Sequence, residues 1–350
     1  MLKMSDIARH AGVSPTTVSF VLNDGPEGER ISEQTRQKVL RAAEELGYRS
    51  NHLARAMRTG DTRMLGLLGG RSAEEQVGRM LEGALIAADK EGYTLKLLRL
   101  DAIDNSAHQA IRRASELRLM GMIALHLPAS ILNELHIEAA KYNTPLVVLD
   151  AQYEMPDVAQ VTSDDVSGIE AGVAHLVALG HSRIAFIGGL TDTLTARKEA
   201  FEAAMSRHGL AIETDFIQNS HFRLRETSLA AARALLCRES HLRPTAIFCS
   251  GDLIALATLQ VAAEVGVRVP HDLSLVGFAN LTASEFATPP LTTIEQPFTE
   301  MGKVAVETLL GIISSRSNEG STDGKKSQPF IKRVLPTQLI ERASTGRIAR

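Results

Sequence analysis

Short polar side chains and one aromatic side chain share one face of a predicted helix near the start of the chain. The residues on this face are Pro15, Thr16, Thr17, Ser19, Phe20 and Asn23. Val18, Val21 and Leu22 recur at spacings of three and four residues, which predicts a buried stripe on the same helix. Hydroxyl and amide groups hydrogen-bond to phosphate oxygens, and a helix with such a face suits the major groove of DNA. The pattern therefore indicates nucleic-acid recognition.

Two short helices around a tight turn are expected to position this face. Ile7 and Ala8 give the first helix an apolar side, and Gly12 lies in the turn. Ser14 is a good N-cap for the second helix, and Pro15 at the first helical position loses no useful N–H. An ordinary surface helix hairpin would fit the same short pattern.

A third helix favours the helix-turn-helix interpretation. Ser32 is its expected N-cap, residues 33–46 show helical apolar spacing, and Gly47 supplies a C-terminal signal. We expect a DNA-reading head over residues 1–48.

No enzyme signature accompanies this pattern. The sequence has no GxGxxG after a strand, no GxxxxGK[ST], no GxSxG, no HExxH and no CxxC. Asp164 and Asp165 lie where a helix is predicted to begin, so capping and compensation of the helix dipole account for them. His181 is interpreted as a structural turn residue. We expect no catalytic residue, no metal and no cofactor.

Length and composition fit a chain of two or three domains. The chain has 350 residues, 44% of them apolar, and a net charge of -3. Residues 1–60 carry nine basic and seven acidic residues, so the head is about +2 and the remainder about -5. Cys237 and Cys249 have no metal spacing and are too few for a disulfide framework, which favours a cytoplasmic protein. Neither a signal peptide nor a membrane-spanning run is apparent.

From Thr62 onward, short apolar runs alternate with helical patterns. The first series of runs is MLGLLGG, TLKLLRL, GMIALHL and PLVVLD, and the second is AQVTSD, RIAFIGG, AIFCSG and LSLVGF. This alternation predicts parallel sheets covered by helices on both faces, with enough units for two α/β subdomains.

Four blocks follow one another along the chain. The first block is the head, with the sequences DIARHAGVSPTTVSFVLN, ISEQTRQKVLRAAEELGY and NHLARAMRTG. The other three blocks are HLVALGHSRIAFIGG (175–189), GVRVPHDLSLVGF (266–278) and PPLTTIEQP (289–297). In these blocks the sequence resembles the lactose-repressor (LacI/GalR) family of bacterial transcription regulators. The resemblance implies a helix-turn-helix head, a hinge helix and a two-subdomain α/β core like a periplasmic binding protein.

The resemblance also implies domain boundaries. The head spans 1–48, the hinge helix or linker spans 49–60, and the core spans 61–350. Within the core, we expect subdomain 1 at about 61–161 and 292–325, and subdomain 2 at about 162–291 and 326–342. No leucine heptads follow, so a dimer is expected rather than a tetramer.

For DNA, the resemblance assigns base reading to Pro15, Thr16 and Phe20. Many relatives have Arg where this chain has Phe20, and Arg would grip guanine in two places, whereas Phe20 offers only apolar contact, for instance to a thymine methyl. Phosphate contacts, which position the head, are expected from Ser5, Ser14, Thr17, Ser19, Asn23, Ser32 and Thr35.

The hinge helix is expected to bind the minor groove. Asn51 would cap it, and Arg55 and Arg58 would lie near phosphates or the groove floor. Met57 stands where the family usually has Leu, and this apolar side chain would wedge between central base pairs and bend the duplex. A plain linker is the alternative, because two turns of helix are marginal alone in water.

For a small-molecule effector, the resemblance points to the cleft between the subdomains. Arg197 aligns with the family's effector-binding arginine, with a surface salt bridge as its alternative. Phe222 stands where relatives stack an aromatic ring on a sugar or purine, with a core position as its alternative. The remaining candidates are Arg71, His126, Asp150, Asp252 and Asn280.

Two departures argue against a standard free hexose. The family commonly has Asn-Asp where this chain has Gly251-Asp252, and it commonly has Asp where this chain has Ala279. The Asn and Asp side chains that are missing at Gly251 and Ala279 hold sugar hydroxyls in relatives. A phosphorylated or acidic sugar, a nucleobase or a divergent ligand is therefore expected instead.

Together, these features predict a homodimeric, sequence-specific regulator, most simply a repressor, that binds a near-palindromic DNA operator. A small-molecule effector would control it, either as an inducer or as a corepressor. The competing interpretations are a cytoplasmic ligand-binding protein of the clamshell type and an α/β enzyme, neither with a role on DNA. The head, the hinge and the missing catalytic motifs disfavour both.

Overall fold

The computed structural model of the chain describes residues 3–22, 31–47, 61–69, 74–99, 106–125, 127–151, 155, 157–189, 192–221, 223–318 and 330–348. The chain separates into two compact units, Met1–Thr62 and Arg63–Arg350. We call them the head and the core. Among the described helices, none is long and apolar enough to cross a membrane.

The head is a three-helix unit, as predicted. Its helices are α1 (Met4–Ala11), α2 (Pro15–Leu22) and α3 (Glu33–Glu45). Ile7 from α1, Val18 from α2 and Val39 from α3 are each fully buried in one cluster. Gly12 ends α1 with a φ of 67°, a left-handed conformation that glycine adopts without strain. The turn between α1 and α2 therefore follows directly from the sequence.

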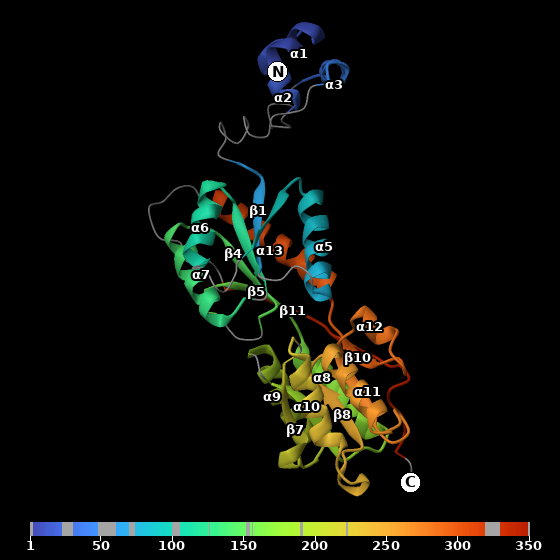
Figure 1. Ribbon diagram of the computed structural model, residues 1–350. Coiled ribbons are helices and arrows are strands. Elements are labelled where there is room, and N and C mark those ends of the chain that lie inside the picture. Colours follow the sequence, from blue (N-terminus) through green and yellow to red (C-terminus); the bar gives the residue numbers. More distant parts are fainter. Residues whose placement is uncertain are drawn as a thin grey trace. The chain divides into compact units, whose positions relative to one another are not determined.

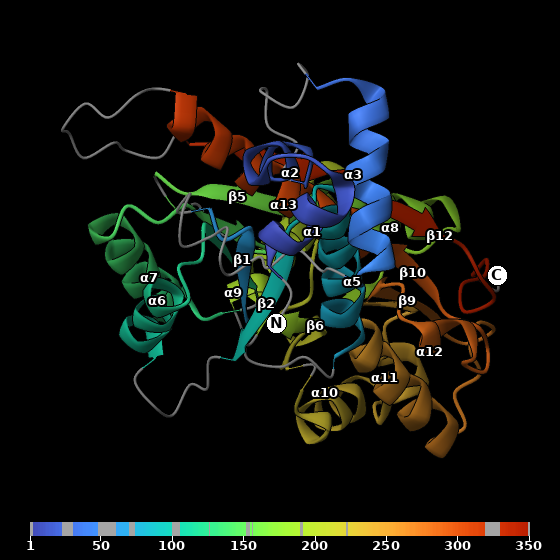
Figure 2. The same ribbon diagram turned by 90° about the horizontal axis from the view of Figure 1, so that it is seen from above.

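The core contains two six-stranded sheets. The first has the order β11-β5-β4-β3-β1-β2, and all its strands are parallel. Its strands are β1 (Met64–Gly69), β2 (Thr94–Arg99), β3 (Gly121–Leu125), β4 (Leu146–Leu149), β5 (Ala159–Ser163) and β11 (Lys332–Leu335). Four helices cover it, namely α5 (Glu75–Lys90), α6 (Ser106–Glu116), α7 (Ala129–Lys141) and α13 (Phe298–Asn318). Helices α5 and α13 pack on one face, and α6 and α7 on the other (Figures 1 and 2).

The second sheet has the order β12-β10-β9-β8-β6-β7, and only the β10–β12 pair is antiparallel. Its strands are β6 (Ile184–Gly189), β7 (Ile217–Ser220), β8 (Ala246–Cys249), β9 (Ser274–Ala279), β10 (Thr292–Glu295) and β12 (Gln338–Ile340). The α-helices around it are α8 (Asp165–Ala178), α9 (Asp192–Arg207), α10 (Arg225–Leu236), α11 (Asp252–Glu264) and the short α12 (Thr282–Glu285). Helices α8 and α9 cover one face, and α10 and α11 the other. Each sheet with its helices forms one subdomain.

The chain passes between the two subdomains three times. It crosses after β5, after β10 and between β11 and β12. Two predicted assignments are wrong here. Residues 292–295 were expected in subdomain 1 but pair with β9 and β12 in the second sheet. Residues 332–335 were expected in subdomain 2 but pair with β5 in the first. The second crossing therefore comes after the strand, at Gln296 and Pro297, rather than before it.

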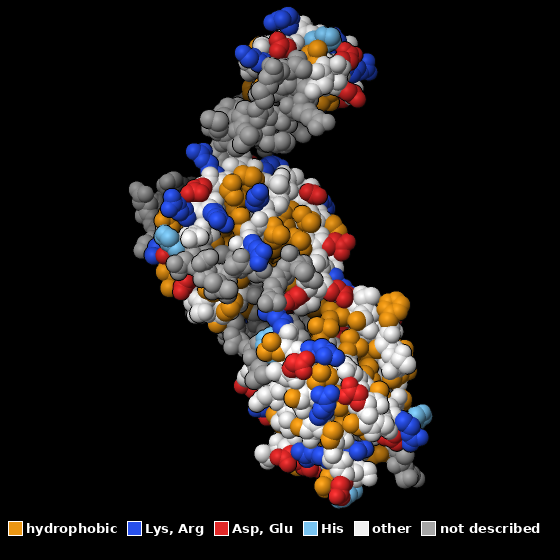
Figure 3. Space-filling view, viewed as in Figure 1, with side chains coloured by type: hydrophobic (Ala, Val, Ile, Leu, Met, Phe, Trp, Pro, Cys, Tyr) orange, Lys and Arg blue, Asp and Glu red, His pale blue; other side chains and the backbone are white. Residues whose placement is uncertain are grey.

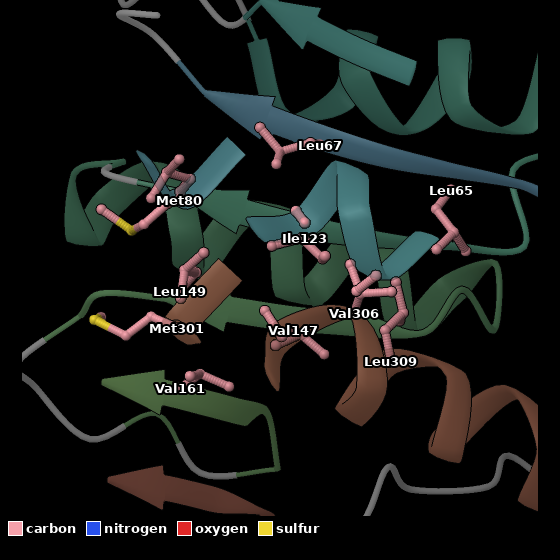
Figure 4. Close-up of a cluster of buried hydrophobic side chains, with 14 of the residues drawn as sticks. Leu65, Leu67, Met80, Ile123, Val147, Leu149, Val161, Met301, Val306 and Leu309 are labelled. Atoms are coloured by element: carbon pink, nitrogen blue, oxygen red, sulfur yellow. The ribbon is translucent and has the colours of Figure 1, made fainter. Parts of the chain in front are cut away.

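Helices α5 and α13 approach each other closely because glycines face the partner backbone. A Cβ at Gly83 would overlap the carbonyl oxygen of Thr299, and a Cβ at Gly302 would overlap that of Met80. Around this contact, Met80, Met301 and the aliphatic side chains of Figure 4 fill the space between the helices and the sheet. The helix pair therefore behaves as one rigid element.

Replacing Gly302 with Ala should destabilise the core by about 1–3 kcal/mol, because the backbones cannot separate without disturbing the packing. Gly311→Ala is the matched control in the same helix, since nothing lies within 4 Å of a Cβ there. That control should stabilise by up to about 1 kcal/mol through helix propensity. Urea denaturation of both variants measures the difference. Equal effects would contradict the close-packing explanation.

Candidate functional site

The candidate DNA-reading face lies on the outer side of α2. Pro15 and Thr16 are exposed, whereas Thr17, Ser19 and Phe20 are partly buried. Val18 and Val21 occupy the buried side of this helix. The partial exposure of Phe20 leaves part of an aromatic ring available for apolar contact. Asn23 lies outside the described residues.

Two serines use their hydroxyls as helix caps. Ser14 Oγ accepts a hydrogen bond from the backbone N–H of Thr17 at 3.0 Å and lies 2.8 Å from Thr17 Oγ1. Ser32 Oγ likewise accepts a hydrogen bond from the backbone N–H of Thr35 at 3.4 Å and lies 2.9 Å from Thr35 Oγ1. When the threonine hydroxyl donates to the serine, the serine O–H is left to donate to a phosphate oxygen, so capping is compatible with a phosphate contact at a helix N-terminus. Ser5, a further predicted phosphate contact, is exposed on α1.

Several predicted site residues lie outside the described part of the chain. In the hinge these are Asn51, Arg55, Met57 and Arg58, and in the core they are Arg71, His126 and Phe222. The described effector candidates are Asp150, Arg197, Asp252 and Asn280. Three of them follow the C-terminal ends of strands β4, β8 and β9, and Arg197 lies in the helix after β6.

Arg197 is buried and bonded to the protein on all three of its nitrogens. Nε donates to Asp165 Oδ2 at 2.7 Å, Nη1 to the carbonyl oxygen of Ser250 at 2.7 Å, and Nη2 to Gln296 Oε1 at 3.1 Å. Its guanidinium carbon also lies 3.9 Å from the centre of the Phe278 ring. Since Arg197 is 6% exposed, the alternative of a surface salt bridge is wrong.

These partners connect two of the three crossings. Gln296 Nε2 donates to Ser163 Oγ at 2.7 Å, and Ser163 Oγ donates to Asp165 Oδ1 at 2.5 Å. Ser163 ends β5 before the first crossing, and Gln296 follows β10 at the second. We call Arg197, Asp165, Gln296, Ser163 and Ser250 the crossover network. Burial raises the pKa of the Asp165 carboxyl, and the Arg197 charge opposes that shift.

The third crossing joins the same region through Asp164. The backbone N–H of Asp164 donates to Leu335 O at 2.8 Å, and Thr337 Oγ1 donates to Asp164 O at 2.8 Å. Asp164 is also the N-cap of α8, because its carboxylate accepts from the N–H of Ser167. The capping prediction is thus confirmed for Asp164, whereas Asp165 chiefly neutralises Arg197.

The Asp252 carboxylate is hydrogen-bonded to a neighbouring loop. Its carboxylate accepts from the N–H of Leu281 at 2.7 Å, Ser284 Oγ at 2.6 Å and Thr293 Oγ1 at 2.5 Å. Burial is the largest influence on its carboxyl and raises the pKa. With these bonds, Asp252 organises the loop before α12 and has little capacity left for a ligand.

Asn280 and Asp150 both adopt left-handed backbone conformations, with φ values of 51° and 62°. Asn280 Nδ2 donates to Glu295 Oε1 at 2.8 Å, and its Oδ1 accepts from Arg342 at 2.8 Å. Asp150 is buried, and its charge contributes to the raised pKa of Asp165. Three of the four described candidates, Arg197, Asp252 and Asn280, therefore mainly hold protein segments together.

His181 has the structural role that the sequence predicted. It is buried, with Nδ1 3.0 Å from Thr245 Oγ1 and Nε2 3.0 Å from the carbonyl oxygen of Gly346. Burial lowers the pKa of its imidazole. The side chain thereby ties the end of the chain to the second sheet.

Arg197→Ala should destabilise the core by roughly 3–5 kcal/mol, because Asp165 would remain buried without its counter-charge. Combining Arg197→Ala with Asp165→Asn should recover part of the loss. The control is Lys198→Ala, since Lys198 forms only a partly exposed i,i+4 pair with Glu202. Chemical denaturation compares the variants. A loss below 1 kcal/mol for Arg197→Ala would show that the network is not structural.

Comparison with known proteins gives concordant results. A sequence profile described as "Bacterial regulatory proteins, lacI family" matches residues 3–51, and one described as "Periplasmic binding protein-like domain" matches residues 173–345. The HTH-type transcriptional repressor PurR of Aliivibrio fischeri (strain MJ11) is 32% identical over 323 residues, covering 91% of this chain and 94% of the relative.

Solved structures are similar over nearly the whole chain. The lac repressor dimer bound to operator and the anti-inducer ONPF has a TM-score of 0.80 at 24% identity, covering 99% of each chain. The complex of the transcriptional regulator CelR with cellobiose has a TM-score of 0.69 at 26% identity, covering 98% of this chain and 100% of that one. Both agree with the arrangement of a helical head and a two-sheet core.

Proposed function

The chain belongs to the lacI family of bacterial regulatory proteins, and from this premise we propose that it represses transcription as a homodimer bound to a near-palindromic operator. The observation that carries the proposal is the head, in which α2 exposes a small polar face while its apolar stripe is buried. We further propose that the protein acts in the cytoplasm and has no catalytic activity.

Dimerisation follows from the geometry of this class of head. One recognition helix reads only a few base pairs, so two heads on a two-fold axis match two half-sites. The core offers apolar surface for such an association: Phe286, the residue after α12, is 79% exposed, and Leu253 on the neighbouring α11 is 45% exposed. Exposed apolar side chains on adjacent helices are typical of protein interfaces. We propose that these two helices contribute to the dimer contact.

Phe20 should determine a base preference. Phe20→Arg is expected to shift the selected operators towards guanine at one symmetric pair of positions, because Arg binds guanine O6 and N7 together. Thr35→Ala, which removes a proposed phosphate contact, should weaken binding to all sequences alike. Selection from a random DNA library, followed by sequencing, measures both effects. Unchanged base preferences for Phe20→Arg would exclude Phe20 from base reading.

The hinge contributes the second part of the proposal. Met57 would wedge into the minor groove, with Asn51 capping the hinge helix and Arg55 and Arg58 near the phosphates. We propose that effector binding changes the arrangement of the two subdomains and thereby the spacing of the two hinges. An effector that favours the DNA-bound arrangement would be a corepressor, and one that opposes it would be an inducer.

For the effector, we propose an anionic metabolite or a nucleobase. The crossover network uses one N–H on each nitrogen of Arg197, so within the described part of the chain Nη1 and Nη2 each retain one N–H for an acceptor on the ligand. Asp252 is already committed to the protein, and Gly251 and Ala279 offer no polar side chain. Among the described candidates, few groups therefore remain to hold the hydroxyls of a free sugar, whereas Arg71 and Arg197 would suit an anion and Phe222 a planar ring.

A thermal-shift screen of the full chain tests this assignment. The panel holds free sugars, sugar phosphates, sugar acids, nucleobases and nucleosides. A ligand at a hundred times its dissociation constant adds about 2.7 kcal/mol of stability. For an anionic hit, Arg71→Ala should reduce the shift, whereas Lys96→Ala, at an exposed position on β2, should not. A hit only among neutral free sugars would contradict the proposed class.

A further inference from the structure

A pair of opposite charges bridges the two subdomains at the start of α5. Arg223 Nε donates to Glu74 Oε1 at 2.7 Å, and Arg223 Nη2 donates to Glu74 Oε2 at 3.1 Å. Glu74 precedes α5 on the first sheet, and Arg223 precedes α10 on the second. The two side chains are 19% and 31% exposed, so the bidentate contact is partly shielded from water.

A second contact lies beside it. Glu75 Oε1 accepts from the backbone N–H of Thr282 at 3.0 Å and from its hydroxyl at 2.7 Å. Arg79, one turn further along α5, donates to the carbonyl oxygen of Asn280 at 3.0 Å. Charged side chains of both signs gather at this junction in the space-filling view (Figure 3). We call these residues, together with Glu74 and Arg223, the interdomain clasp.

The clasp differs from the crossover network in two respects. Its contacts join side chains of one subdomain to side-chain and backbone groups of the other, away from the connecting segments, so it can open without disturbing either sheet. Its charges are also partly solvated, which makes the contact weaker and sensitive to salt. Helix α5, which carries one side of the clasp, is closely packed against α13 at Gly83 and Gly302.

We infer that the Glu74–Arg223 pair is an electrostatic clasp that holds the subdomains of the core in their closed arrangement. When the pair separates, the subdomains can rotate about the three crossings, and the Thr282–Glu75 contact opens with it. The clasp therefore sets the balance between closed and open core independently of which effector binds.

Hydrogen exchange of the Thr282 amide in the full-length protein tests the inference. This N–H is bonded across the junction to Glu75, whereas the neighbouring N–H of Leu281 is bonded to Asp252 within the second subdomain. Opening of the clasp should expose the Thr282 amide and leave the Leu281 amide protected. Mass spectrometry with fragmentation to single residues separates the two.

Glu74→Arg and Arg223→Glu should each accelerate exchange at Thr282 by about twofold to fivefold, as expected for loss of a partly exposed ion pair. The double variant Glu74→Arg/Arg223→Glu should restore the slow rate. In wild type, 1 M KCl should raise the rate towards that of the single variants. The matched control is Glu264→Arg, which breaks a pair with Arg233 that lies within one subdomain; it should leave the Thr282 rate unchanged.

Three results would overturn the inference. One is an unchanged Thr282 rate in both single variants. Another is equal acceleration at Leu281, which would indicate local unfolding of the loop. The third is failure of the double variant to restore protection, which would show that the two charges do not act on each other. Circular dichroism of each variant ensures that exchange is compared between folded proteins.

Discussion

Burial of the Arg197 guanidinium is the constraint on which the arrangement of the core depends. A charge at 6% exposure is tolerated only with a counter-charge and satisfied N–H groups. Asp165 supplies the charge, and Gln296 and the carbonyl oxygen of Ser250 accept the remaining bonds. Asp165 follows one crossing and Gln296 lies at another. Because the Arg197 guanidinium bonds to both residues, the two crossings must come together beside it. The two sheets are thereby joined at a defined place.

The packing of α5 against α13 extends that constraint to the rest of the first subdomain. Helix α13 begins at Phe298, two residues after Gln296. Its Gly302 contacts the backbone of α5, whose first two turns carry Glu75 and Arg79 of the interdomain clasp. The crossover network and the clasp are thus connected through two closely packed helices.

The sequence predicted the elements better than their assignment to sheets. Caps at Ser14 and Ser32 and the spacing of Val18 and Val21 specify the head, because these signals are local. The strands at 292–295 and 332–335 were assigned to the wrong subdomains, since a strand of four residues carries no information about which sheet it joins. The role of Asp165 was also missed, because a carboxylate at a helix start is explained by capping until a distant cation is found beside it. The Asp164-Asp165 doublet was a usable signal, as one acid suffices for a cap. Asp252 illustrates the same limit, because its hydrogen-bond partners lie 29 to 41 residues further along the chain.

The magnitudes indicate which contact can act as a switch. Breaking a buried ion pair costs roughly 3–5 kcal/mol, whereas a partly exposed pair contributes at most about 1 kcal/mol. Coupling between an effector site and a distant site is typically about 1–3 kcal/mol. A switch that opened the crossover network would need more than this coupling supplies. Separation of the clasp, together with the few hydrogen bonds beside it, lies within the range. The crossover network is therefore suited to act as the fixed point of rotation, and the clasp as the contact that differs between the two states. An effector that bridges the subdomains near Arg197 needs only to outweigh or reinforce the clasp in order to bias the core.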